Sequence, residues 1–170
     1  MDRRQSDFGR VYEDHVWRVY GFLAYRVRDR DLAEDLTQAT FERALRAWSR
    51  FDPRRGSERT WLLAIARNAM IDHHRRHHRE QLDATEFLTA TVPGPEERVG
   101  AFSELAGALA ALSDRDRDVL ALRFGAELTG PEIAKLMDLT LANVQQIISR
   151  SLRKLRTLLG GETAVSSNVQ

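Results

Sequence analysis

Apolar residues recur at steps of three and four along most of the chain, a period that is typical of amphipathic helices. The first predicted helix runs from about Phe8 to Arg28. The second begins with Asp31 as its N-cap and ends near Ser49, and the third begins near Glu58 and ends in the basic sequence IDHHRRHHRE. Because only four prolines and ten glycines interrupt the pattern, we expect an all-α fold.

A second group of helices is predicted from about Ala101 onward. Ser113 is a suitable N-cap for one helix, and Thr129 and Thr140 are suitable N-caps for two short helices that follow them. A Pro-Gly-Pro sequence among acidic residues separates the two groups and indicates a flexible linker. We therefore expect two small helical domains at 7–80 and 101–160, joined by a linker at 81–100 and followed by a tail at 161–170.

The sequence 128–155 has the pattern of a helix-turn-helix, whose second helix enters the major groove of DNA. The predicted buried face of that second helix consists of Val144, Ile148, Leu152, Leu155 and Leu159. Its outward face carries side chains suited to base edges and phosphates, namely Gln145, Gln146, Ser149, Arg150 and Arg153. A helical hairpin with a solvated polar face is the alternative, but the spacing, the caps and the outward residues together favour DNA binding.

Composition narrows the class of protein. With 42% hydrophobic and 30% charged residues, the chain can bury a core but is too charged for a membrane protein. It has no apolar run of about 18 residues and no visible secretory signal. The absence of cysteine excludes disulfides and thiolate metal sites, so we expect a cytoplasmic protein. Residues 1–81 carry a net charge of +4, residues 82–111 of −4 and residues 112–170 of +1, which supports two modules and a linker.

A basic segment at 51–79 is a second candidate for nucleic-acid binding. Phe51 and Trp61 could stack on unpaired bases. The arginines that could contact phosphates are Arg54, Arg55, Arg59, Arg67, Arg75, Arg76 and Arg79. The alternative is that Trp61 belongs to the core and the arginine run is a solvated helix end, which the helix dipole favours.

The sequence HHRRHH at 73–78 spaces two pairs of histidines by four residues, which can place two ligands on one metal ion. Only the neighbouring acids Asp72 and Glu80 offer a third ligand, so a basic nucleic-acid surface is the better interpretation. No glycine-rich phosphate loop, nucleophile elbow or zincin motif is found. We therefore expect no catalytic residues, no metal and no cofactor.

Three stretches together resemble the sigma-70 family of bacterial RNA polymerase sigma factors, in particular its extracytoplasmic-function (ECF) group. They are DLAEDLTQATFERALRAWSRFDPRRG at 31–56, RTWLLAIARNAMIDHHRR at 59–76 and LSDRDRDVLALRF at 112–124 with the helix-turn-helix after it. The resemblance implies a transcription-initiation factor without catalytic activity. Its N-terminal region-2 domain would bind core RNA polymerase and melt the promoter −10 element, and its C-terminal region-4 domain would read the −35 element.

The resemblance also assigns residues. The expected contacts to the clamp helices of the largest polymerase subunits are Asp35, Gln38, Phe41 and Glu42, with Phe41 as an aromatic at the exposed edge. The expected −10 residues are Phe51, Arg54, Arg55, Ser57, Arg59, Thr60, Asn68, Asp72, Arg75 and Arg76. The expected −35 residues are Thr140, Asn143, Gln145, Gln146, Ser149, Arg150 and Arg153. Relatives of this kind are often held inactive by an anti-sigma factor, so such a partner is expected, without direct membrane insertion.

The chain departs from the family pattern in the recognition helix and its turn. Gln145 and Ile147 stand where basic residues are common in the family, and Asp138 replaces a frequent glycine. The −35 DNA sequence that this helix reads therefore cannot be inferred from the −35 sequences that its relatives read. Ile147 is open to two interpretations, contact with a thymine methyl group or packing in the core. Two other classes of function remain as alternatives: a dimeric repressor or activator that uses the same helix-turn-helix, and a nucleic-acid-processing metalloenzyme that uses the histidines.

Overall fold

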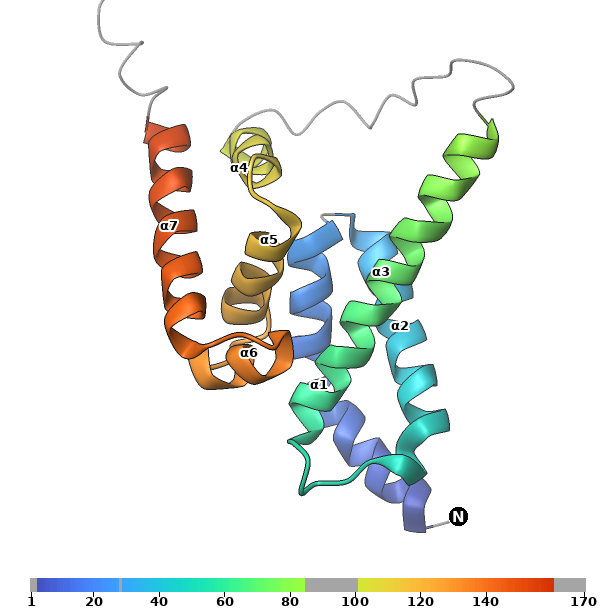
Figure 1. Ribbon diagram of the computed structural model, residues 1–170. Coiled ribbons are helices and arrows are strands. Elements are labelled where there is room, and N and C mark those ends of the chain that lie inside the picture. Colours follow the sequence, from blue (N-terminus) through green and yellow to red (C-terminus); the bar gives the residue numbers. More distant parts are fainter. Residues whose placement is uncertain (1–2, 28, 85–100, 161–170) are drawn as a thin grey trace, which may run out of the picture.

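The computed structural model describes residues 3–27, 29–84 and 101–160, and every regular element in these ranges is helical (Figure 1). The predicted linker and tail lie largely outside the described residues. None of the described helices combines the length and the apolar composition that crossing a membrane requires. In chain order the elements are α1 (Arg3–Val27), α2 (Arg30–Ala47), the 3₁₀ turn η1 (Trp48–Arg50), α3 (Glu58–Ala84), α4 (Ala101–Ala110), α5 (Asp114–Leu120), the π-helical turn η2 (Ala121–Gly125), α6 (Gly130–Met137) and α7 (Leu141–Gly160).

The caps explain where most of these helices begin. Ser113 accepts a hydrogen bond from the backbone N–H of Asp116, and Thr140 accepts one from Asn143, which confirms both as N-caps. The N-cap of α2 is Asp29, whose side chain accepts a hydrogen bond of 3.0 Å from the N–H of Leu32, so the prediction of Asp31 was wrong by two residues. Asp29 has the extended backbone that a cap requires, and Asp31 lies instead in the first helical turn.

Helices α1, α2 and α3 form the N-terminal unit around one apolar core. Its fully buried side chains include Val11, Val19, Phe22, Leu23, Leu62, Leu63 and Met70. Thr37 and Thr40 of α2 are also buried. The hydroxyl group of Thr37 donates a hydrogen bond of 2.7 Å to the carbonyl of Ala33, and that of Thr40 donates one of 2.7 Å to the carbonyl of Leu36. These threonines therefore add no unpaired hydroxyl group to the core.

Helices α4 to α7 form the C-terminal unit, in which α6 and α7 are the predicted helix-turn-helix. The carboxylate of Glu132 accepts hydrogen bonds from the N–H and the hydroxyl of Thr129, which closes the first turn of α6. Asp138 ends α6 in the left-handed conformation, with φ 53° and ψ 52°. This backbone explains why glycine would suit the position, and Asp is among the few other residues that tolerate it.

The two units pack directly against each other. In Figure 1, α5 lies beside the C-terminal half of α1, and one continuous hydrophobic cluster includes buried residues of both units. At the centre of the contact, Gly21 of α1 meets Gly125 of η2, and the carbonyl oxygen of each glycine occupies the place where a Cβ on the other would lie. The sequence pattern predicted two modules, and their close packing is a feature that only the structure reveals.

Candidate partner-binding groove and nucleic-acid interface

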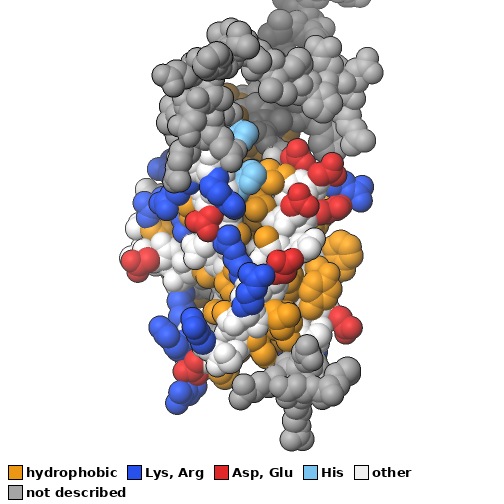
Figure 2. All heavy atoms as spheres, turned by 90° about the vertical axis from the view of Figure 1, so that its right-hand side faces the viewer, with side chains coloured by type: hydrophobic (Ala, Val, Ile, Leu, Met, Phe, Trp, Pro, Cys, Tyr) orange, Lys and Arg blue, Asp and Glu red, His pale blue; other side chains and the backbone are white. Residues whose placement is uncertain are grey.

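A groove of about 660 Å³ runs between α1 and α2. Its wall on α1 includes Tyr12 and Trp17, which are 46% and 76% exposed, and its wall on α2 includes Leu45, which is 47% exposed. Hydrophobic side chains also gather on the face of the molecule that Figure 2 shows, where acidic side chains border them. Exposed aromatic side chains bordered by charge are typical of a surface that binds another protein.

The predicted polymerase-binding residues of α2 border this groove or lie near it. Asp35, Gln38 and Glu42 are exposed, and the Gln38 amide donates a hydrogen bond of 3.1 Å to Glu42. Phe41 is only 5% exposed, so the expectation of an exposed-edge aromatic was wrong. Its ring packs edge-on against Tyr12 at 4.7 Å between ring centroids, and it forms part of the groove wall.

The exposed aromatics of the groove come from α1, which the sequence assignment did not include. Trp17 contacts Tyr20 edge-on, with 6.1 Å between the ring centroids. A signal was available in the sequence, because Trp17 falls off the apolar stripe that contains Val16 and Val19 and therefore points toward solvent.

The loop between α2 and α3 is shaped by local hydrogen bonds. Asp52 accepts hydrogen bonds from the backbone N–H and the guanidinium of Arg54, and the Arg54 side chain, followed by the backbone N–H, lowers the pKa of that carboxyl group. Ser57 accepts a hydrogen bond of 3.2 Å from the N–H of Thr60 at the start of α3. These bonds leave Arg54 and Arg55 exposed on the outside of the loop.

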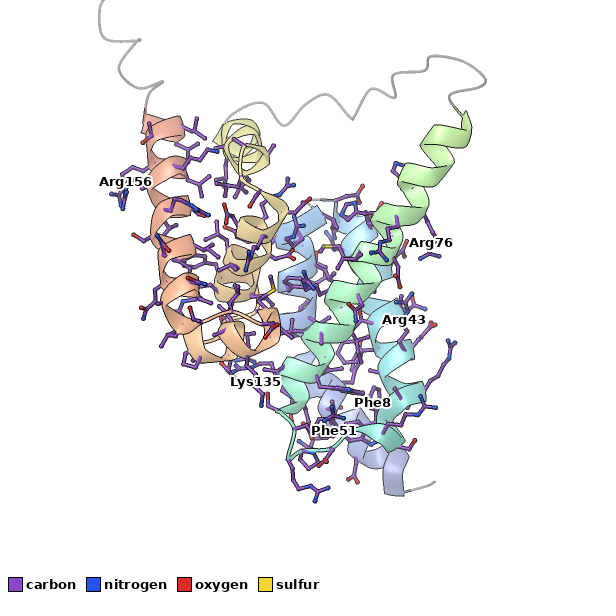
Figure 3. All side chains as sticks on the ribbon, in the orientation of Figure 1. Phe8, Arg43, Phe51, Arg76, Lys135 and Arg156 are labelled. Atoms are coloured by element: carbon purple, nitrogen blue, oxygen red, sulfur yellow. The ribbon has the colours of Figure 1, made fainter. Side chains whose placement is uncertain are left out.

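Phe51 is already stacked on neighbouring aromatic rings. Its ring lies parallel to Trp48, with 5.1 Å between centroids and 7° between planes, and 5.2 Å from Trp61. Trp61 is half-buried and packs against the core, as one of the two interpretations of the sequence proposed. The three rings form a rigid aromatic platform at the base of the loop, where Figure 3 places Phe51.

The predicted −10 residues divide into exposed and paired groups. Those exposed to solvent are Arg54, Arg55, Ser57, Asn68, Arg75 and Arg76. Asp72 forms an ion pair of 3.0 Å with Arg43 of α2, which the sequence assignment missed. Arg43 and Arg76 project from the same side of the molecule in Figure 3, and they line a depression of about 400 Å³ with Arg75. The three arginines and Asp72 make this depression a predominantly basic surface on α2 and α3.

Two of the arginines that were expected to contact phosphates point instead toward the C-terminal unit. Arg59 forms an ion pair of 2.5 Å with Glu132 of α6, and Arg67 forms one of 2.9 Å with Asp118 of α5. The expectation that both side chains contact phosphates is therefore wrong for the arrangement described. The side chain of Arg79 lies outside the described residues.

All the predicted −35 residues are exposed, from Thr140 at the N-cap of α7 to Arg153 within that helix. The predicted buried face was partly wrong: Ile147 and Ser151 are buried at 8% and 1%, whereas Leu152 is 40% exposed. Ile147 therefore belongs to the core, which is one of the two interpretations of the sequence. The residue pairs 147/151 and 148/152 have the same spacing of four, so periodicity alone does not decide which pair faces the core.

The histidines form no metal site among the residues that the structure describes. The rings of His73 and His77 stack at 6.2 Å with 8° between their planes. Burial lowers the pKa of both His15 and His74, although Glu58 acts in the opposite direction on His15.

Three surfaces of the molecule, namely the groove, the basic and aromatic loop with α3, and the outer face of α7, are suited to binding a protein and nucleic acid.

Comparison with known proteins identifies both units. The model for "Sigma-70 region 2" matches residues 11–80, and that for "Sigma-70, region 4" matches residues 108–157. The chain is 31% identical over 152 residues to the ECF RNA polymerase sigma factor SigM of Bacillus subtilis, covering 87% of this chain and 92% of SigM. It is 32% identical over 163 residues to the RNA polymerase sigma factor CarQ of Myxococcus xanthus, covering 94% of this chain and 92% of CarQ.

Two solved structures share the fold. The sigma factor RpoE of Bartonella quintana, determined with the anti-sigma factor NepR, superposes with a TM-score of 0.73 at 22% identity, covering 91% of this chain and 97% of RpoE. CnrH, determined with the cytosolic domain of CnrY, superposes with a TM-score of 0.65 at 27% identity, covering 92% of this chain and 90% of CnrH.

Proposed function

The chain belongs to the ECF group of the sigma-70 family of RNA polymerase sigma factors. From this premise we propose which of its surfaces binds each partner in transcription initiation. It binds core RNA polymerase and directs it to promoters. The proposal assigns a partner to each of three surfaces: the groove on α1 and α2, the loop 51–60 with α3, and the outer face of α7. The single observation that carries it is that these three surfaces lie on separate parts of the molecule and differ in chemistry.

The groove between α1 and α2 is assigned to the clamp helices of core polymerase. Its apolar wall provides the area that a stable complex buries, and Asp35, Gln38 and Glu42 provide polar contacts at its edge. Trp17 joins this assignment as the central aromatic anchor, because buried tryptophan side chains supply much of the binding energy at protein interfaces.

The loop 51–60 and α3 are assigned to the −10 element. Single-stranded bases bind by stacking on aromatic rings and by hydrogen bonds to their edges, and Phe51 and the exposed Asn68 offer both. Arg75 and Arg76 are positioned to bind phosphates of the same strand. Strand opening then proceeds by capture of unstacked bases, with no catalytic step by the chain itself.

The outer face of α7 is assigned to the −35 element as duplex DNA. Its exposed Gln145, Gln146 and Arg150 are side chains that bind adenine and guanine edges in the major groove. Arg150 also forms an ion pair of 2.9 Å with Asp116 of α5, which fixes its direction before DNA binds.

An anti-sigma factor is the proposed negative regulator. Both superposed structures, those of RpoE and of CnrH, were determined with a second protein, an anti-sigma factor in the case of RpoE. A partner of this kind would cover the apolar groove and exclude polymerase. The place of action is then the cytoplasm, where polymerase and promoter DNA are found.

The test is a pull-down of core polymerase with the purified chain, followed by run-off transcription from a library of genomic fragments. Binding together with discrete new start sites is the expected result, and the start sites define the −35 and −10 sequences. Tight specific binding to duplex DNA without any binding to polymerase would contradict the proposal. It would favour the dimeric repressor or activator instead.

A further inference from the structure

Two exposed arginines on the outer face of α7 differ in how their guanidinium groups are held. Arg150 donates a hydrogen bond of 2.9 Å from Nη2 to Oδ1 of Asp116 on α5. Arg153 lies three residues further along α7, and its side chain takes part in no ion pair among the residues that the structure describes. Before DNA binds, one cation is therefore fixed in direction and the other is not.

Asp116 is held firmly by its own surroundings. It lies in the first turn of α5, and its backbone N–H donates a hydrogen bond of 3.2 Å to the N-cap side chain of Ser113. Helix α5 packs beside α7 in Figure 1, and Leu120 and Leu155 join the two helices in one hydrophobic cluster. The side chain of Asp116 is only 12% exposed, whereas that of Arg150 is 61% exposed. The carboxylate is thus a fixed acceptor that decides the direction of the guanidinium.

The ion pair uses only part of the Arg150 guanidinium. Arginine has five N–H donors in a planar fork, and the hydrogen bond to Asp116 occupies one of them. The other donors stay available, because the side chain is largely exposed on the same face as Gln146. Two such donors can bind O6 and N7 of one guanine in the major groove. The contact with Asp116 is therefore compatible with reading a base.

An arginine on a DNA-binding surface has a second possible partner, the phosphate backbone. Phosphates and sugars accept most protein–DNA hydrogen bonds, and these contacts carry no direct sequence information. The carboxylate of Asp116 opposes such a contact, because it offsets the positive charge of Arg150 and keeps the side chain from turning to the backbone. It also reduces the conformational entropy that Arg150 loses when it binds a base edge. Asp116 therefore favours base contacts over phosphate contacts.

We propose that Asp116 is a positioning residue for promoter specificity, which directs Arg150 to a guanine of the −35 element and keeps it from the phosphate backbone. This proposal rests on the −35 function assigned to α7 above. Arg150 then supplies discrimination between sequences, and Arg153 supplies affinity for phosphates. Loss of the Asp116 carboxylate should therefore strengthen binding to DNA of any sequence while it weakens discrimination between sequences.

Two substitutions remove the carboxylate in different ways. Asp116→Ala removes every acceptor and suits a helix, and Asp116→Asn keeps the shape of the side chain but leaves only a weaker, neutral acceptor. Asp138→Asn is the matched control, because it removes one exposed carboxylate from the turn of the same helix-turn-helix, and asparagine also tolerates the left-handed backbone there. Arg150→Ala, alone and combined with Asp116→Ala, shows whether both residues act through one contact. Circular dichroism checks that each variant is folded.

The primary measurement is the base preference of the holoenzyme, assembled from core RNA polymerase and the full chain. It binds a library of promoter fragments randomised through the −35 element, and sequencing of the bound fragments gives the preference at each base pair. We expect the parent and Asp138→Asn to prefer guanine at one base pair where Arg150→Ala loses the preference. Asp116→Ala should reduce that preference at least about fivefold, the lower end of what one bidentate base contact contributes, and Asp116→Asn should reduce it less. The double variant should lose no more than Arg150→Ala alone.

Salt dependence separates positioning from a structural defect in α5. On a duplex without promoter elements, Asp116→Ala should bind more tightly, and its affinity should fall more steeply with salt, by about one phosphate contact, because the released Arg150 turns to the backbone. A structural defect would weaken binding to every duplex instead, which would contradict the proposal.

The outcomes distinguish this proposal from the function on which it rests. A clear −35 preference in the parent that Asp116→Ala leaves intact, or a further loss when Asp116→Ala is added to Arg150→Ala, would overturn the positioning role alone. A parent holoenzyme with no −35 preference, or an Arg150→Ala variant with every preference intact, would contradict the base reading assigned to α7 and with it this proposal.

Discussion

Replacing Asp118 by Asn removes the negative charge at the centre of the interface and keeps the shape of the side chain. The carboxylate is 6% exposed and accepts hydrogen bonds from Arg26 and Arg67. Asparagine offers one acceptor oxygen, and its amide N–H groups cannot accept from a guanidinium. The substitution therefore leaves a buried cation without its main partner.

The expected cost follows from the burial of each partner. Removing one member of a buried ion pair costs about 3–5 kcal/mol. Arg67 is 33% exposed and can regain water, and Arg26 keeps Asp114 at 3.4 Å, so the lower value of about 3 kcal/mol applies. At 1.4 kcal/mol per factor of ten, this weakens the association of the two units by about 100-fold.

Scanning calorimetry measures this effect. Because both partners of Asp118 belong to the other unit, the lost energy comes from the interface. We expect a single unfolding transition in the unaltered protein and two transitions, one for each unit, in Asp118→Asn. The control is Asp14→Asn, which breaks an exposed pair of 3.1 Å with Arg10 and should change stability by less than about 1 kcal/mol. A single transition within about 2 °C of the unaltered protein would refute the reasoning.

Three further predictions address the assigned surfaces and the dependence on pH. Asp35→Arg combined with Gln38→Ala should reduce co-purification with core polymerase at unchanged circular dichroism; equal recovery would remove the groove assignment. Gln145→Ala should lower −35-dependent transcription about 5- to 150-fold, the equivalent of roughly 1–3 kcal/mol for one base contact, while polymerase binding stays constant. Burial lowers the pKa of His15, so the stability it supports is present above the usual histidine pKa of about 6.5 and is lost as the pH falls below it. The melting temperature should therefore fall between pH 7.5 and 5.5, and by less in His15→Gln; equal falls would show that His15 does not titrate as argued.

The helices and their order were predictable because their determinants are local. Apolar steps of three and four residues mark one face of each helix, and the side chains of Ser113 and Thr140 cap the backbone within three residues of themselves. The outward face of α7 followed from the same period, and so did the exposure of Asp35 and Gln38 on α2. None of these features needs a contact with a distant part of the chain.

The errors occurred where a side chain depends on a neighbour that is distant in sequence. Phe41 was expected at an exposed edge, but the rings of Phe8 and Tyr12 from α1 cover it. Arg59 and Arg67 were expected to face DNA phosphates, yet carboxylates more than fifty residues away bind them. Charge pattern identifies a basic surface, but the partner of each cation is decided by packing.

The sequence by itself determined that the chain is helical, that it contains a helix-turn-helix and that it resembles a sigma factor, since periodicity, caps and motifs are properties of neighbouring residues. Only the tertiary structure decided that Ile147 belongs to the core, that Trp17 lines a groove, and that Gly21 and Gly125 bring the two units into contact. The sequence of a helix does not show that one of its glycines lies against another backbone segment; only the tertiary structure shows this. The contact between the two units is therefore a property of the fold that no local pattern along the chain could have indicated.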